Sequence, residues 1–207
     1  MLARESYRHG DLRQALIDVA LEMAREGGPD AVVLREATRR AGVSPNAAYR
    51  HFTDRTELVE AVSNAAQALV AGAIEAEWYA VPATLSAAES AHAHLRAVGR
   101  GYLGFARDEP GLFRAAFTVP TDLETALSAE KAGPSGRTSF QLLAIALDEL
   151  VTVGALPADR RPGAEFSAWS AVHGLAMLVL EGPLRNLDPD VARAAGARLI
   201  DMVDRGL

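Results

Sequence analysis

Apolar side chains recur at helical spacing along almost the whole chain, and polar positions fill the opposite faces. The first stripe runs through residues 12–23 and stops at Gly27 and Gly28. Its apolar positions lie three or four residues apart, which is the period of an amphipathic helix. β-branched and aromatic residues nowhere alternate with polar ones over six residues, so no strand is predicted. The pattern predicts an all-α fold of about nine helices.

Residues that favour helix starts mark several of the predicted boundaries. Serine and aspartate are good N-caps, proline suits the first helical position, and a glutamate three residues after the cap completes a capping box. Four segments begin in this way: Ser44-Pro45, Asp54 with Glu57, Ser86 with Glu89, and Asp188-Pro189.

The helix lengths divide the chain into two predicted domains. Residues 1–53 hold a compact unit of three helices, and residues 54–207 hold a bundle of longer helices that begins with a long fourth helix. Residues 118–137 lack a helical period, so we expect a mobile connection with at most one helical turn. The fourth helix is expected to bury Leu58, Val62, Ala65, Leu69 and Ala73.

Composition excludes several function classes. The chain has no cysteine, which removes disulfides, thiolate nucleophiles and cysteine-based metal sites. His92 and His94 are two residues apart and point to different sides of a helix, and GPSGR at 133–137 lacks the context of a nucleophile elbow. No run reaches the ~20 apolar residues of a membrane span, and the first twelve residues have no apolar signal core. We therefore expect a cytoplasmic protein that is not an enzyme and holds no metal or cofactor.

The charge is unevenly distributed. Residues 31–55 hold five arginines against Glu36 and Asp54, a balance of +3, whereas residues 61–207 hold 12 basic and 17 acidic residues. A basic segment on an acidic body suits a small nucleic-acid-binding module. An ordinary solvated surface is the other interpretation of this segment.

The segment 34–58 has the pattern of a helix-turn-helix. A helix from about Leu34 is followed by a turn at Gly42 and a second helix of seven residues from Pro45. Tyr49 follows Asn46 by three residues and Arg50 follows it by four, so all three share one exposed face that can reach base edges and phosphates. The alternative is the amphipathic end of a core helix. Tyr49, His51 and Phe52 span too much of so short a helix for all three to be buried.

The motifs of this segment match one family pattern. They are Arg35, the turn Gly42-Val43-Ser44, the run Tyr49-Arg50-His51-Phe52, and Arg55. Through them residues 10–60 resemble the N-terminal domain of TetR-family transcriptional regulators. The chain departs from that pattern at Ala37 and Thr38, which should loosen the small core, and at Arg55, where lysine is usual. The resemblance implies that phosphates or bases are contacted by Arg35, Ser44, Pro45, Asn46, Ala47, Tyr49, Arg50, His51 and Arg55.

The remaining chain resembles a TetR ligand-binding domain with Trp169, His173 and Gly174 in one helix. The resemblance implies a homodimer formed by helices near 166–182 and 189–205. The helix over 166–180 is apolar on too many sides for one partner, which favours a second chain. We expect one set of side chains to line a ligand pocket, or alternatively to fill the core: Tyr102, Phe105, Phe113, Phe117, Trp169, His173 and Met177.

Together these patterns predict a TetR-like regulator, most simply a repressor, that binds a pseudo-palindromic DNA operator as a homodimer. A small apolar or amphipathic effector would release it. Activation of transcription would share every feature above. The alternative from another class is a helical small-molecule-binding protein or enzyme with a vestigial helix-turn-helix.

Overall fold

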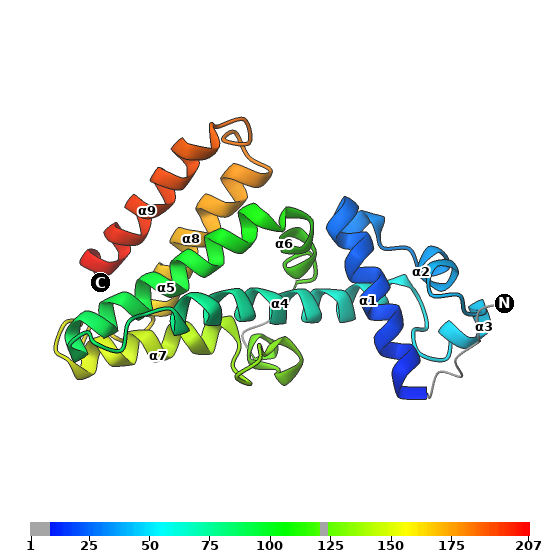
Figure 1. The fold of residues 1–207 in the computed structure, drawn as a ribbon, viewed down its shortest axis with the longest axis horizontal. Helices are drawn as coiled ribbons and strands as arrows, with labels where there is room; N and C mark the ends of the chain where they lie inside the picture. Colours follow the sequence, from blue (N-terminus) through cyan, green and yellow to red (C-terminus); the bar gives the residue numbers. More distant parts are fainter. Residues whose placement is uncertain (1–8, 121–123) are drawn as a thin grey trace. The chain divides into compact units, whose positions relative to one another are not determined.

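A computed structural model describes residues 9–120 and 124–207, with side chains from residue 12 on (Figure 1). Over these residues the chain forms nine α-helices and no strand, which confirms the predicted all-α fold. The helices are α1 His9–Gly27, α2 Leu34–Arg40, α3 Pro45–Ala48, α4 Arg55–Tyr79, α5 Ala87–Asp108, α6 Pro110–Ala116, α7 Ser139–Thr152, α8 Ala164–Leu180 and α9 Pro189–Gly206. Three 3₁₀ turns complete them: η1 Pro29–Ala31, η2 Thr125–Leu127 and η3 Ala129–Lys131.

The described residues divide into two compact units. The first comprises residues 9–66 and 110–120, and the second comprises residues 67–109 and 124–207. The units therefore part inside α4, whereas the predicted domains meet at residues 53 and 54, just before this helix begins.

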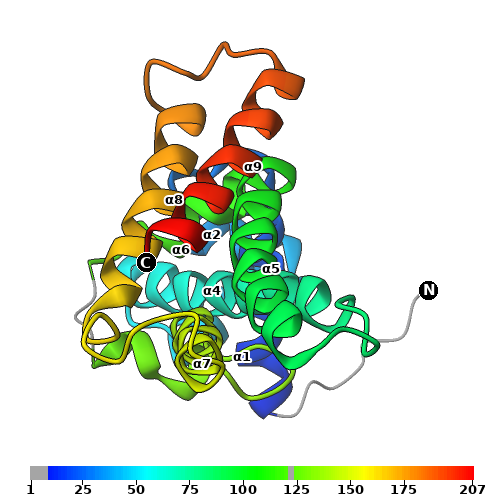
Figure 2. The ribbon, with the colours of Figure 1, turned by 90° about the vertical axis from the view of Figure 1, so that its left-hand side faces the viewer.

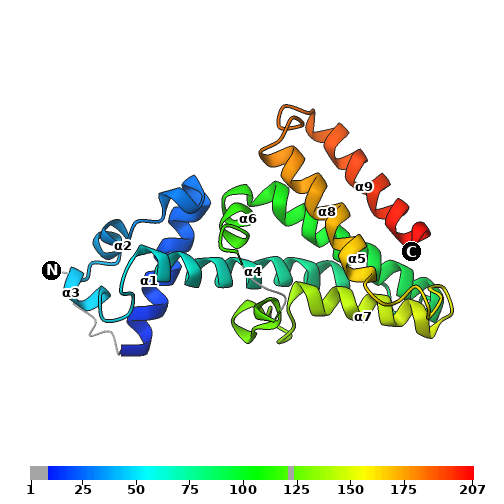
Figure 3. The ribbon, with the colours of Figure 1, turned by 180° about the vertical axis from the view of Figure 1, so that it is seen from behind.

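In the first unit, α1 is the central helix. It packs against α2, α3, α6 and η1 (Figure 3). Leu16, Val32, Phe52 and Leu58 are fully buried in the core of this unit. Burial of these large side chains supplies the main driving force for this unit, because helices as short as α2 and α3 are not stable on their own in water.

In the second unit, α5 packs against α7, α8 and α9, while α8 and α9 run side by side in opposite directions (Figure 2). The second half of α4 approaches α5 closely at Gly101. A Cβ atom at this position would lie 2.5 Å from the Cα of Ile74 and 2.8 Å from the carbonyl oxygen of Ala73. Glycine is therefore required where these two backbones meet.

Most predicted helix starts have the expected caps. The side chain of Ser44 accepts a hydrogen bond from the N–H of Ala47, and Ser86 with Glu89 forms a complete capping box. The predicted box at Asp54 is only half formed. Asp54 Oδ1 accepts from the Glu57 N–H at 3.0 Å, but the Glu57 carboxylate accepts from the N–H of Thr53 at 2.7 Å.

The buried stripe of α4 differs from the predicted one. Leu69 is 40% exposed, so its predicted burial is wrong, and the neighbouring positions Ala65 and Ala73 are only half-buried. The helix is apolar on several sides, and steps of four residues from Val62 define the stripe that packs. Its buried members are Leu58, Val62, Ala66, Val70 and Ile74.

The segment after residue 123 has more helical turns than expected. It forms η2 and η3, and the loop that follows is held to α4, because the N–H and hydroxyl of Ser135 both donate to the buried carboxylate of Glu75. The expectation of at most one helical turn is wrong for residues 124–137, which contain two 3₁₀ turns, and the mobility of this connection stays a prediction. Part of the predicted connection, residues 121–123, lies outside the described residues.

Candidate functional site

The turn between α2 and α3 has the geometry of a helix-turn-helix. Gly42 adopts a φ of +68°, a left-handed conformation that a side chain would strain. The N–H of Val43 donates to the carbonyl of Thr38 at 3.1 Å, which ties the turn back to α2. Thr38 also donates its hydroxyl to the carbonyl of Arg35 and is almost fully buried, so it takes part in the small core.

The helix after the turn is shorter than predicted. Helix α3 covers four residues instead of seven, and residues 49–51 form a turn in which Arg50 and His51 donate to carbonyls three residues earlier. Ala48 and Phe52 are fully buried and fix the orientation of this segment. Tyr49 is 55% exposed whereas Phe52 is fully buried, which confirms that Tyr49, His51 and Phe52 are not all buried.

The predicted DNA-contacting residues form one mostly exposed set in the first unit. The side chains at two of the nine positions, Ala47 and His51, are half-buried. The exposed members are Arg35, Ser44, Pro45, Asn46, Tyr49, Arg50 and Arg55.

Two arginines of the basic segment are neutralised within the unit. Arg39 donates to Glu36 at 2.6 and 2.7 Å, and Arg40 donates to Glu36 and Glu26 at 3.0 Å. The hydrogen bonds from Arg39 and Arg40 lower the pKa of Glu36 to about 2, so this carboxylate stays ionised at neutral pH. The +3 balance of residues 31–55 already counts Glu36, and Glu26 from outside the segment lowers the local positive charge by one more.

Arg55 has a structural role that the sequence did not indicate. Its Nε donates to the carbonyl of Val32 at 2.7 Å, and its Nη2 donates to the carbonyl of Pro29 at 2.9 Å. Half of the side chain remains exposed. The planar guanidinium makes both bonds at once, which the single ammonium of the usual lysine cannot reproduce in that geometry.

In the second unit, three of the predicted ligand residues form a hydrogen-bonded cluster. The Trp169 Nε1–H donates to Tyr102 Oη at 3.2 Å, and Tyr102 Oη lies 2.7 Å from His173 Nδ1. Burial raises the pKa of Tyr102 and lowers that of His173, which keeps both groups neutral at pH 7. The tyrosine oxygen thus joins Trp169 and His173 in one hydrogen-bonded group.

The other predicted ligand residues are distributed over both units. Phe113 and Phe117 belong to the first unit, where their ring centroids are 5.0 Å apart and Phe113 is fully buried. Phe105 and Met177 belong to the second unit, on α5 and α8. That all seven residues contact a ligand stays a prediction.

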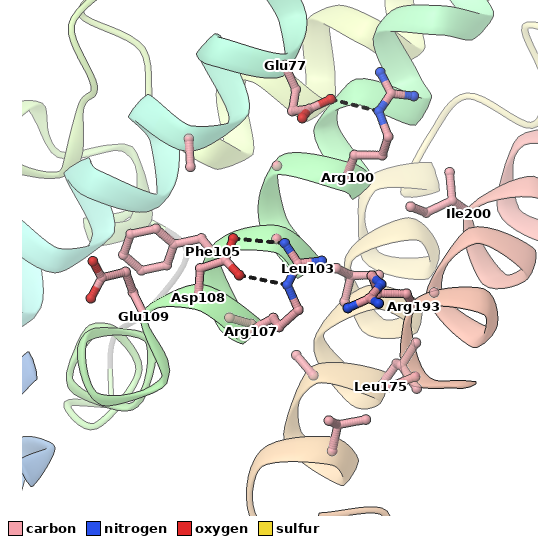
Figure 4. Close-up of a pocket in the computed structure, with 18 of the residues that line it drawn as sticks. Glu77, Arg100, Leu103, Phe105, Arg107, Asp108, Glu109, Leu175, Arg193 and Ile200 are labelled. Atoms are coloured by element: carbon pink, nitrogen blue, oxygen red, sulfur yellow. Dashed lines mark hydrogen bonds and ion pairs between the residues drawn. The ribbon is translucent and has the colours of Figure 1, made fainter. Parts of the chain in front are cut away.

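A cavity of about 540 Å³ lies within the second unit, between α5, α8, α9 and the second half of α4 (Figure 4). Of the seven predicted ligand residues, Phe105 is the one that lines it. Figure 4 shows Glu77 and Arg100 together on one side, and Arg107 and Asp108 on another. Sequence reasoning missed these charged residues because each is typical of an exposed helix surface. The small residues that α5 and α9 turn toward the cavity, among them Gly104 and Gly196, were the available signal.

Helices α8 and α9 also carry large apolar side chains that the single chain leaves exposed. Phe166 and Leu178 of α8 are 52% and 43% exposed, and Val191 and Met202 of α9 are 52% and 61% exposed.

None of the helices in the described ranges has both the length and the apolar composition to span a bilayer.

Comparisons with family models cover both units. A model described as bacterial regulatory proteins of the tetR family matches residues 16–62, which include α2, the turn and α3. A model described as the tetracyclin repressor-like C-terminal domain matches residues 95–203, more than half of the chain. No curated protein is similar enough to count as a match.

Solved structures share the fold over nearly the full length. A protein of unknown function from Rhodococcus sp. RHA1 is 25% identical, with 99% of both chains covered and a TM-score of 0.71. A TetR-family transcription regulator from Shewanella sp. PV-4 is 19% identical, with 91% of this chain and 95% of that chain covered and a TM-score of 0.57. A TetR variant from Acinetobacter baumannii AYE in complex with minocycline is 18% identical, with 93% of this chain and 94% of that chain covered and a TM-score of 0.56. With family models on both units, an all-helical fold and a helix-turn-helix in the first unit, the chain belongs to the TetR family of transcriptional regulators.

Proposed function

We propose that this regulator is a repressor that binds a pseudo-palindromic operator as a homodimer and is released by a small molecule bound in its second unit. The observation that carries the proposal is the exposed side-chain set on α2, α3 and the following turn. Asn46, Tyr49 and Arg50 point away from the buried pair Ala48 and Phe52. Asparagine and arginine recognise base edges in the major groove, and tyrosine donates to phosphates.

The exposed apolar side chains of α8 and α9 support the homodimer. Phe166, Leu178, Val191 and Met202 each leave about half of their surface uncovered in one chain. A second chain that covers the two helices would remove these apolar side chains from water. We propose that two copies pair α8 and α9 as a four-helix bundle, so that two α3 segments meet successive major grooves about 34 Å apart.

Release by a ligand requires an element that both sites influence. Helix α4 contributes residues to both units, so a change in its position can alter the separation of the two recognition segments. The A. baumannii TetR variant binds minocycline, an example of a small molecule bound by this fold. We propose that this chain responds to an effector in the same general way.

The test is fluorescence anisotropy of the full chain with labelled DNA from around its own gene. Binding should weaken by about a thousandfold or more between 50 and 200 mM salt if six or more phosphates are contacted. Tyr49→Ala and Arg50→Ala should each weaken it by about tenfold, the scale of one lost DNA contact. Arg39→Ala is the matched control, because this exposed arginine lies in the same module but bonds to Glu36.

Each outcome distinguishes two interpretations of the protein's function. If Tyr49→Ala and Arg50→Ala bind as the unmodified chain does, the proposed DNA-facing surface is wrong. If no salt-sensitive binding occurs at all, a helical small-molecule-binding protein or enzyme with a vestigial helix-turn-helix is the better description. Analytical ultracentrifugation at micromolar concentration tests the dimer, and a monomer would contradict it.

A further inference from the structure

We infer that the cavity between α4, α5, α8 and α9 binds an uncharged, largely apolar molecule that carries one hydrogen-bond acceptor. The cavity is partly open to solvent, and its volume of about 540 Å³ falls within the range of small-molecule sites. The inference deepens the proposed function by naming the class of effector. The inference rests on the proposed function only in so far as ligand binding is expected to release DNA. Ligand binding itself requires no DNA.

Small residues create the space. Among the described residues, a Cβ atom built on Gly104 of α5 meets no side chain or neighbouring helix within 4 Å. Gly104 lines the cavity, and so do alanines from all four helices, such as Ala76, Ala176 and Ala192. Because these side chains are short, they leave the space between the four helices unfilled.

The walls are apolar and come from several helices. Leu103 and Phe105 belong to α5, Leu175 and Val179 to α8, and Ile200 to α9. Burying apolar ligand surface against such side chains contributes roughly 25 cal/mol per Å². The walls therefore favour a hydrocarbon body.

The charged side chains of the lining balance each other. Within the part of the chain that the structure describes, they are three arginines and three carboxylates. Arg100 donates to Glu77 at 2.7 Å, and Arg107 donates to Asp108 at 2.7 and 2.8 Å. An ionised head group would meet no excess of opposite charge here, and these half-exposed ion pairs would offer it little gain to offset the loss of its own hydration.

A neutral acceptor can bind without disturbing the pairs. Arg107 uses its Nε and Nη2 for Asp108, whereas a guanidinium carries five N–H donors. The hydrogen bonds from Arg107 lower the pKa of Asp108, so the pair stays ionised at neutral pH. A ketone or ester oxygen at the edge of the cavity would accept from the remaining donors.

The experiment is isothermal titration calorimetry of the full chain, without DNA, against three probes with the same ten-carbon chain. These are decan-2-one, decanoate and decylammonium. At pH 7 we expect decan-2-one to bind at least tenfold more tightly than either ion. Equal or tighter binding of decanoate or decylammonium, or no binding of decan-2-one, overturns the inference.

Two cavity-filling variants locate the bound probe. Gly104→Leu should weaken decan-2-one binding by at least tenfold, whereas Gly104→Ala, which adds only the Cβ atom, should retain most of it. Ala197→Leu adds a larger side chain to the cavity from α9. It replaces Gly104→Leu in this test if the circular dichroism of Gly104→Leu shows a loss of helix. Unchanged binding to the folded filling variants places the ligand elsewhere and overturns the inference.

The same preparation distinguishes this inference from the proposed function. Salt-sensitive DNA binding by the ligand-free chain, together with no binding of decan-2-one, refutes the inference alone. Binding of decan-2-one by a chain that binds no DNA supports the inference and refutes the proposed repressor.

Discussion

The close crossing of α4 and α5 allows the packing of the second unit to be tested at one atom. Replacing Gly101 by alanine adds a Cβ atom 2.5 Å from the Cα of Ile74 and 2.8 Å from its nitrogen. Carbon atoms in contact normally lie about 3.5–4.0 Å apart, so α4 and α5 must separate by roughly 1 Å. Because the obstacle is helix backbone, no rotamer change can relieve the overlap.

The cost follows from overpacking. Inserting a methyl group into a close-packed site costs about 1–3 kcal/mol, and contact with rigid backbone places Gly101→Ala near the upper value, about 3 kcal/mol. Alanine also gains about 1 kcal/mol over glycine in a helix interior. Gly104→Ala, one turn later in α5, gains the same helix propensity but its Cβ meets open space. The difference between the two variants therefore isolates the overlap.

The assay is urea unfolding followed by circular dichroism at 222 nm. With a slope of about 3 kcal/mol per molar urea, a difference of about 3 kcal/mol separates the two midpoints by roughly 1 M. Gly104→Ala should unfold at or above the midpoint of the unmodified chain. Midpoints of Gly101→Ala and Gly104→Ala that coincide within the error of the fit would refute the close approach of α4 and α5.

Two further predictions concern the first unit. Arg55→Lys cannot make both bonds to the backbone carbonyls of residues 29–32, so the free energy of unfolding should fall by about 1 kcal/mol in urea titrations; an unchanged midpoint would contradict this role. Hydrogen bonds from Arg39 and Arg40 lower the pKa of Glu36 from 4.5 to about 2, so their stabilising effect is complete above pH 4.5 and is lost as the pH falls toward 2. Glu36→Gln should flatten this part of the stability profile, and an identical profile for both proteins would exclude the linkage.

The sequence predicted the elements whose signals are local. The turn at Gly42, the capping box at Ser86 and the start of α9 at Asp188 depend on residues within four positions of each other, and the structure has all three. The length of α3 was predicted less well. It depends on how Ala48 and Phe52 pack against other helices, which local spacing does not contain.

Long-range contacts account for what the sequence did not predict. The loop after η3 has no helical period, yet it is held because Ser135 bonds to Glu75, 60 residues earlier. Arg55 and the carbonyl of Val32 are likewise brought together only by folding. The cavity is a third case, since its lining comes from four helices and a count of aromatic residues on single helices could not define it.

The two faces of α9 connect the cavity with the proposed dimer interface, so a bound ligand would affect the geometry of the dimer. Ala192, Gly196 and Ile200 follow each other at intervals of four residues and line the cavity, whereas Val191 and Met202 are exposed. An α-helix moves as a rigid unit, so a ligand that shifts the cavity-lining face of α9 also shifts its exposed face. Ligand and operator would then favour different positions of the same helix.

Such coupling has a consequence that does not depend on the structural details. If decan-2-one lowers the affinity for the operator by some factor, the operator must lower the affinity for decan-2-one by the same factor, because both describe one coupling free energy. We expect a factor of about 5–150, the usual range for allosteric proteins. Anisotropy titrations of operator with and without ligand, and calorimetric titrations of ligand with and without operator, measure the two factors independently. A ligand that binds the cavity with no change in operator affinity would show that α9 does not transmit occupancy. Unequal factors would show that the two titrations do not report one equilibrium, for example because the dimer dissociates in one of them.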